Sequence, residues 1–105
     1  MKRYDKLVRD NIPSIIEAEG NVVLIDKLND EQYLIELNKK IQEEMKEYIE
    51  DNNVEELADI VEVIYALLKL KGVSRKEFEQ IRINKAKRNG RFDKRIYLRS
   101  VYEFI

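Results

Sequence analysis

Residues 54–71 read VEELADIVEVIYALLKLK, and this stretch decides the fold class. Apolar side chains cover most of the circumference that it would have as a helix: Leu57, Ala58, Ile60, Val61, Val63, Ile64, Ala66, Leu67, Leu68 and Leu70. A helix that is apolar nearly all round lies at the centre of a fold or is shared with another subunit. Asn53, with Glu56 three residues later, predicts a capped start, and Gly72 predicts its end.

Two further long helices are predicted on either side of this segment. The preceding one should begin near Asn29 or Asp30 and end near Asp51. Its apolar positions recur at steps of three and four, as one buried stripe requires: Leu34, Leu37, Ile41, Met45 and Tyr48. The following one should begin after Ser74, which forms a second capping box with Glu77, and end before Gly90. Since the connections are short, neighbouring helices should be antiparallel.

The remaining segments are shorter. Pro13 fits the first position of a short helix through Glu19, which Gly20 would end. Segments 22–28 and 95–105 are possible short extended segments that could pair with each other. The chain as a whole is therefore predicted to be all-α: one domain over 1–105, a small antiparallel bundle of three long helices plus the short N-terminal one.

Composition excludes several classes of function. The 105 residues contain no Cys and no His, so a metal would have to be held by oxygen ligands, which favours magnesium or manganese over zinc. A net charge of −1 argues against nucleic acid and membrane surfaces as partners. The polar start, and the lack of any stretch near the ~20 apolar residues of a membrane span, predict a soluble, cytoplasmic protein.

Two pairs of acidic residues face each other across the predicted hairpin. Glu44 and Glu47 lie three apart on one helix, at the edge of its apolar stripe, and Glu56 and Asp59 repeat this spacing on the next. Lys39, Lys40 and Lys46 can offset part of their mutual repulsion, which a divalent ion would remove more completely. Solvated acidic helix faces are the alternative interpretation.

Two basic pairs are candidates for contacts with phosphate. Lys85 and Arg88 share a face near the end of the last predicted helix, where positive charge also favours the helix dipole. Lys6 and Arg9 lie in an N-terminal segment without clear periodicity.

Four sequence motifs together resemble the MazG-like, all-α nucleoside-triphosphate pyrophosphohydrolase superfamily. They are EMKE at 44–47, ELAD at 56–59, the opening YDKLVRDNIP at 4–13 and the ending KAKRNGRF at 85–92. The opening and the ending are similar to the phosphoribosyl-ATP pyrophosphohydrolase-like, or house-cleaning, subgroup. Asn11 and Asn89 depart from its pattern, which has Lys and Gly there.

The resemblance implies a nucleotide substrate cleaved between its α- and β-phosphates, giving a nucleoside monophosphate and pyrophosphate. It implies that Mg²⁺ (or Mn²⁺) is held by four carboxylates: Glu44, Glu47, Glu56 and Asp59. It further implies that phosphate is bound by Lys85 and Arg88, with Lys6, Arg9 and Asp10 matching the subgroup's opening. With no histidine in the chain, Glu47 or Glu43 is the expected proton acceptor.

The helix at 54–71 also predicts self-association. A bundle of only three long helices is thin, and a second copy of the chain would bury the face of this helix that the bundle leaves uncovered. We expect a homodimer or a dimer of dimers. The alternative from another class is a non-catalytic helical module for nucleotide binding or oligomerisation, which should be indifferent to magnesium.

Overall fold

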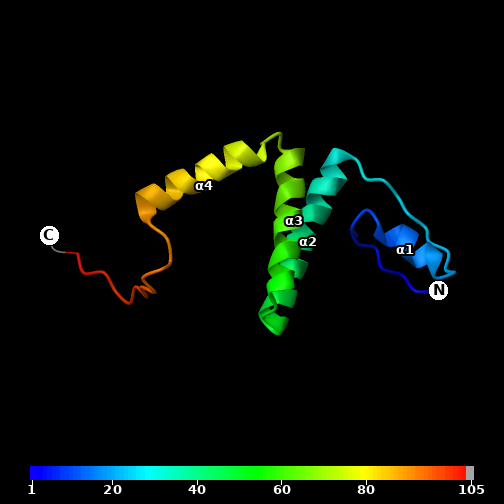
Figure 1. Ribbon diagram of the computed structural model, residues 1–105, viewed down its shortest axis with the longest axis horizontal. Coiled ribbons are helices and arrows are strands. Elements are labelled where there is room, and N and C mark those ends of the chain that lie inside the picture. The colour runs from blue at the N-terminus through cyan, green and yellow to red at the C-terminus, as the bar shows by residue number, and fades with distance from the viewer. Residues whose placement is uncertain (104–105) are drawn as a thin grey trace. The chain divides into compact units, whose positions relative to one another are not determined.

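The computed structural model describes residues 1–103, and over that range the chain is all-helical, which confirms the predicted fold class (Figure 1). The helices are α1 (Ile12–Ala18), α2 (Asp30–Asp51), α3 (Val54–Leu70) and α4 (Arg75–Asn89). Their bounds agree with the predicted ones to within about a residue at most ends. None of the helices in this described part combines the length and apolarity that crossing a bilayer requires.

Helices α2 and α3 form an antiparallel hairpin through the tight turn at Asn52–Asn53 (Figure 1). Asn52 ends α2 in the left-handed conformation at φ 52°, which asparagine tolerates well. Asn53 then caps α3, its side chain accepting a hydrogen bond from the Glu55 amide at 2.9 Å. Because only two residues separate the helices, the last turn of α2 and the first turn of α3 lie side by side.

The end of α3 and the start of α4 also follow local signals. Gly72 adopts φ +74°, and the amides of Gly72 and Val73 return to the carbonyls of Lys69 and Leu68. These two bonds make the Schellman arrangement that a glycine in this position favours. Ser74 caps α4 by accepting from the Glu77 amide at 3.1 Å, while its hydroxyl donates to the Glu77 carboxylate.

The segments predicted as possible extended pieces contain no strand in the described part of the chain. Residues 22–28 and 95–103 have no regular structure, and 104–105 of the predicted tail segment lie outside the described residues. The β-branched run at 22–28 has no paired neighbour, and an unpaired strand cannot satisfy its backbone groups.

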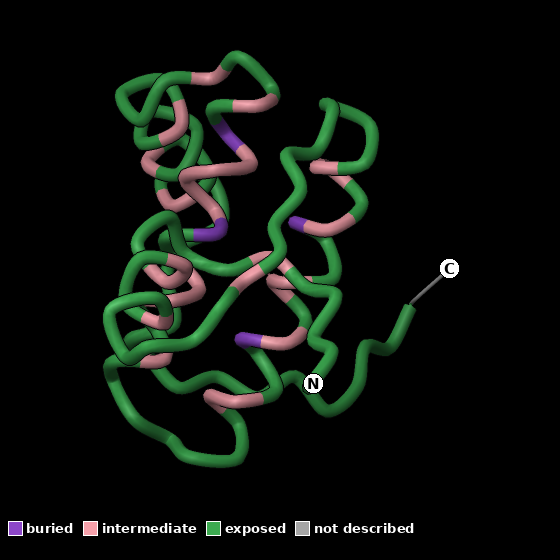
Figure 2. The backbone as a smooth tube through the Cα atoms, turned by 90° about the vertical axis from the view of Figure 1, so that its right-hand side faces the viewer, coloured by how far each residue is buried: buried purple, intermediate pink, exposed green. Residues whose placement is uncertain are grey.

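Few residues are buried (Figure 2). Leu37 on α2 and Val63 and Leu68 on α3 are the buried apolar residues among 1–103, and all three lie in the hairpin. On α3, Val54, Leu57 and Val61 remain 77%, 41% and 39% exposed. Helix α3 thus packs against α2 but keeps part of its apolar surface exposed, so the single chain does not bury it as a central helix, and the predicted alternative of sharing it with another subunit stays a prediction.

The chain divides into two compact units, one spanning Met1–Val73 and one beginning at Ser74. The first contains α1 and the α2–α3 hairpin, and the second contains α4 and the residues after it. The prediction of one domain over 1–105 is not tested by this division and stays a prediction.

Candidate metal centre

Glu44 occupies a position on α2 that an apolar residue would normally fill. It is only 7% exposed, and the stripe that buries Leu37 continues directly into it. At about 100° per residue, seven residues bring Glu44 to within about 20° of Leu37 around the helix axis. The inner face of α2 is therefore apolar toward its start and carboxylic toward the turn.

This arrangement corrects the predicted stripe at one position. Met45, predicted to be buried, is 46% exposed, and Glu44, predicted to lie at the edge, is buried instead. Met45 is turned about 80° from Leu37 around the axis, so it lies to one side of the face that carries Leu37 and Glu44.

The acidic residues of α3 lie close to its start. Glu56 falls in the first turn, three residues after the cap Asn53, where the helix dipole favours negative charge. Glu56 precedes the buried Val63 by seven residues, so it faces α2 as Val63 does. Asp59 lies one turn further along and is half-buried.

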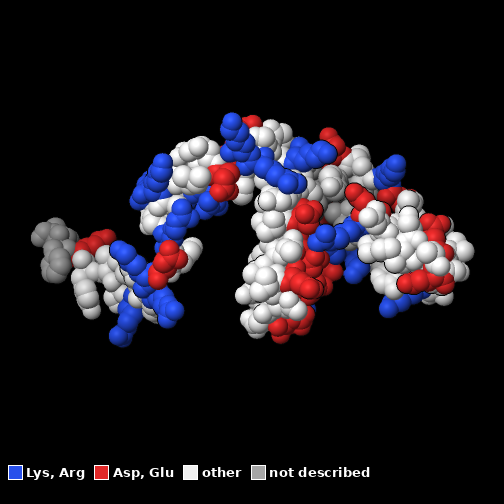
Figure 3. All heavy atoms as spheres, in the orientation of Figure 1, with Lys and Arg blue, Asp and Glu red and all other residues white. Residues whose placement is uncertain are grey.

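The structure brings all the predicted metal ligands together in two overlapping groups. Carboxylate oxygens of Glu44, Glu56 and Asp59 lie within 4.8 Å of one another, and so do those of Glu43, Glu44 and Glu47. Glu44 belongs to both groups and joins them. Figure 3 shows acidic side chains in a band along the α2–α3 hairpin, with basic side chains against it. We call these five carboxylates the acidic cluster.

The electrostatic cost of this crowding is visible in two pKa values. Burial raises the pKa of Glu44 above its ordinary 4.5, Glu47 raises it further through a hydrogen bond and charge repulsion, and Lys40 partly offsets both. The pKa of Glu56 is also raised, first by burial and then by the neighbouring charges of Asp59, Asp51 and Glu44. Two of the five carboxylates are thus harder to ionise than usual.

Three basic side chains contact the acidic cluster. Lys40 Nζ lies 3.4 Å from Glu43 Oε1 and 3.3 Å from Glu44 Oε1, in the (i, i+3) and (i, i+4) geometry of a helix surface. Lys6 Nζ donates to Glu43 Oε1 at 3.4 Å, and Arg9 Nη2 donates to Asp59 Oδ1 at 2.5 Å. From the sequence, Lys40 was expected only to offset part of the repulsion among the acidic residues. Its spacing of four residues from Glu44 was the signal that could have predicted this particular ion pair.

Two carboxylate oxygens in the acidic cluster have no partner at all. Glu44 Oε2 and Glu56 Oε2 are enclosed by protein and accept no hydrogen bond. A buried, unpaired carboxylate oxygen is costly, and a cation is one way to remove the cost. Glu47 and Glu56 also form no ion pair among the described residues, so basic side chains contact only three of the five carboxylates, Glu43, Glu44 and Asp59.

The second predicted basic pair lies in the second unit. Lys85 and Arg88 are exposed on α4, Arg88 in its last turn together with Lys87. They keep the favourable position near a helix C-terminus that the sequence predicted. Among the described residues of the second unit, no acidic cluster of this kind occurs beside them.

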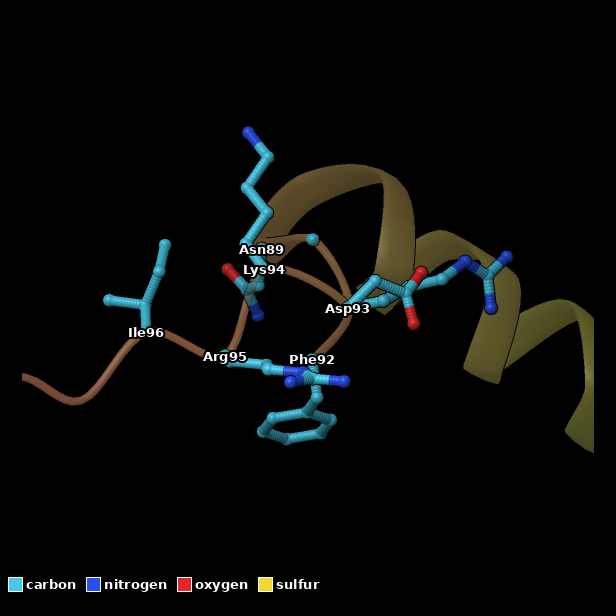
Figure 4. Close-up of a pocket in the computed structure, with 8 residues that line it drawn as sticks. Asn89, Phe92, Asp93, Lys94, Arg95 and Ile96 are labelled. Carbon is cyan, nitrogen blue, oxygen red and sulfur yellow. The ribbon is translucent and has the colours of Figure 1, made fainter.

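A shallow depression of about 350 Å³ follows α4 (Figure 4). Eight consecutive residues, 89–96, line it, and the turn is closed by the Arg95 amide donating to the Phe92 carbonyl at 3.1 Å. The side chains of Lys94 and Phe92 extend in opposite directions from this turn. Its lining does not converge on one point, so we do not assign a ligand to it.

Comparison with protein-family models, with curated proteins and with solved structures found no match for this chain.

Proposed function

We propose that this protein is a magnesium-dependent nucleotide pyrophosphohydrolase whose metal is held by the acidic cluster. The single observation that carries the proposal is the meeting of Glu44 from α2 with Glu56 and Asp59 from α3 within 4.8 Å. The sequence resemblance to MazG-like enzymes supports the same assignment, because its four expected metal ligands all lie in this cluster.

The residues present fit a hard divalent cation. Mg²⁺ and Mn²⁺ prefer carboxylate oxygens, and the acidic cluster offers no other ligand type. The enclosed and unpartnered Oε2 atoms of Glu44 and Glu56 are the donors that such an ion would satisfy first. Glu44, Glu47, Glu56 and Asp59 would hold it.

When bound, magnesium would supply charge neutralisation and polarisation of the substrate's phosphate oxygens. The protein's part is to orient water and to accept its proton. Glu47 suits this role better than Glu43, because Glu43 Oε1 already lies within 3.4 Å of both Lys6 and Lys40. Glu47 forms no ion pair in the described part of the chain, so one of its oxygens could accept the proton while the other holds the metal.

The basic residues would neutralise the phosphates. Lys6 and Arg9 already lie against the acidic cluster and are the candidates that the first unit itself supplies. Lys85 and Arg88 on α4 remain candidates from the resemblance. The substrate class that we propose is a non-canonical nucleoside triphosphate, with its base and sugar open.

We also propose that the protein acts as a homodimer or a dimer of dimers. The exposed residues Val54, Leu57 and Val61 lie at steps of three and four and therefore share one face of α3. Together with the small buried core, this face supports self-association.

The same exposed face favours a second candidate function, a helical oligomerisation or nucleotide-binding module without catalysis. Its acids would then be solvated charges, and magnesium would change neither its stability nor its ligand binding.

The experiment that tests the proposal measures pyrophosphate release from a panel of canonical and damaged nucleoside triphosphates and phosphoribosyl-ATP, with magnesium and with chelator. We expect magnesium-dependent release from at least one of them. Asp59→Asn should abolish release, whereas Glu62→Gln, which changes an exposed acid of α3, should retain it. Absence of release across the panel by folded protein would favour the module.

A further inference from the structure

The N-terminal segment is tied to the acidic cluster by two ion pairs. Lys6 reaches Glu43 on α2 across 37 residues of sequence, and Arg9 reaches Asp59 on α3 across 50. The other ion pairs of the described residues join side chains no more than four residues apart. We call residues 6–9 the basic strap.

The basic strap contacts both groups of the acidic cluster. Glu43 belongs to the group with Glu44 and Glu47, and Asp59 belongs to the group with Glu44 and Glu56. The two strap cations together therefore neutralise one member of each group, as a divalent ion bound by both groups would do. Between the two cations, Leu7 is the one residue of 1–10 that is not exposed, which anchors the strap.

The strap contacts are of a kind that can be exchanged. The side chains of Arg9 and Lys6 are 57% and 44% exposed, so water can replace their partners. Exposed ion pairs stabilise little, whereas a divalent ion bound by several carboxylates interacts with all of them. The positive charge of Arg9, which lies against Asp59, also opposes the approach of a metal cation to that carboxylate.

We propose that the basic strap is an internal counter-cation that stands in for the metal, and that divalent metal binding releases Arg9 from Asp59. The inference rests on the proposed metal centre, whose second support is the buried and unpartnered Oε2 of Glu44. Released from Asp59, the Arg9 guanidinium is free for a phosphate beside the metal. The order of events is thus metal first, then substrate anion.

The first test compares the affinity for Mg²⁺ of three proteins by calorimetric titration: wild type, Arg9→Gln and Arg3→Gln. Arg3 is the matched control, because it pairs only with Asp5 at 2.8 Å and both side chains are largely exposed. We expect Arg9→Gln to bind Mg²⁺ about two- to fivefold more tightly than wild type, the range given by loss of an exposed pair. Arg3→Gln should match wild type.

The second test uses unmodified protein and does not depend on a variant's folding. Trypsin cleaves after Lys6 in the strap and after Lys27 in the exposed segment 21–28, and mass spectrometry follows both peptides. Mg²⁺ should speed cleavage at Lys6 several-fold relative to cleavage at Lys27, because the strap is released.

The outcomes separate this inference from the proposed function. Wild-type protein that binds no Mg²⁺ would overturn both. Mg²⁺ binding with equal affinity in wild type and Arg9→Gln, or with unchanged or slower relative cleavage at Lys6, would overturn the strap alone and leave the metal centre standing.

Discussion

Glu44 and Glu56 meet across the α2–α3 hairpin, and each has an oxygen, Oε2, that is enclosed by protein and accepts no hydrogen bond. The two carboxylates come from opposite sides of the turn and replace apolar residues on the inner faces of their helices. The hairpin therefore gives up part of a small core for charge that its own Lys40 neutralises only at Glu44. From this relationship we expect the stability of the protein to depend on cations and on pH.

The first prediction concerns metal. Magnesium at about 100 times its Kd should stabilise the folded protein by about 2.7 kcal/mol, which raises Tm by roughly 10–20 °C in a domain of this size. Glu56→Gln should lose most of that rise while the metal-free Tm holds or increases, since one repelling charge is gone. Thermal melts with Mg²⁺ and with chelator measure both values.

The matched control for this prediction is Glu62→Gln, because Glu62 is an exposed acid of the same helix and is not in the acidic cluster. It should keep the full metal-induced rise. An equal loss of the rise in Glu62→Gln would mean that magnesium acts on general surface charge.

The second prediction concerns pH in the absence of metal. A carboxyl with a raised pKa binds its proton more tightly in the folded than in the unfolded state, so stability falls as pH rises. Glu44 and Glu56 both have raised pKa values, so the free energy of unfolding should fall as pH rises from about 4.5 through those values. Chemical denaturation in chelator across this range measures the fall.

Glu44→Gln should flatten this pH dependence, and saturating magnesium should suppress it. Glu50→Gln is the control, since Glu50 is exposed on α2 and forms no ion pair among the described residues. A steep fall that survives in Glu44→Gln would assign the effect to other groups.

Local signals in the sequence predicted the bounds of the helices closely, whereas the contacts between the helices were harder to predict. Asn52–Asn53, Gly72 and Gly90 interrupt the chain at fixed places, which is why the bounds of α2, α3 and α4 were predicted closely. The spacing of Glu44 and Glu47 likewise predicted a shared helix face. Which face is buried depends on the neighbouring helix, and the assumption that apolar means buried was wrong for Met45.

The link between Arg9 and Asp59 could not be predicted from spacing. Fifty residues separate them, and the segment that carries Arg9 has no periodic pattern to fix its path. The sequence offered Lys6 and Arg9 as a candidate basic pair and the family resemblance supported it, but neither predicted that Arg9 pairs with Asp59. The ion pair of Lys40 with Glu44 could have been predicted from the sequence, because a Lys four residues before a Glu lies on the same helix face.

The third prediction separates the two candidate proton acceptors. Glu47→Gln should lower kcat for pyrophosphate release by about 10²–10⁴, the usual contribution of a general base. Glu43→Gln should cost less, because Lys6 and Lys40 already engage that carboxylate. Steady-state kinetics at saturating magnesium, with metal binding measured alongside, checks the pair. Full activity in Glu47→Gln would exclude Glu47 from the role.

The fourth prediction concerns how much the small apolar core of the hairpin contributes to the stability of the protein. Leu37 is 3% exposed, so Leu37→Ala should cost about 2–5 kcal/mol in the free energy of unfolding. Ile35→Ala, at a position 50% exposed on the same helix, should cost much less. Urea denaturation of both variants provides the comparison, and similar losses would show that Ile35 is covered by another chain.

The fifth prediction concerns the exposed face of α3. Val54 and Val61 are 77% and 39% exposed on that face, and a second copy of the chain would bury them. Light scattering should therefore give two or four times the 12.6 kDa chain mass. Val61→Lys should lower this mass toward that of one chain, because a buried, unpaired ammonium is costly. Gln42→Lys adds the same charge at an exposed position of α2 and should leave the mass unchanged. A wild-type protein of single-chain mass would mean that α3 keeps this face in water, and self-association would then have no part in its function.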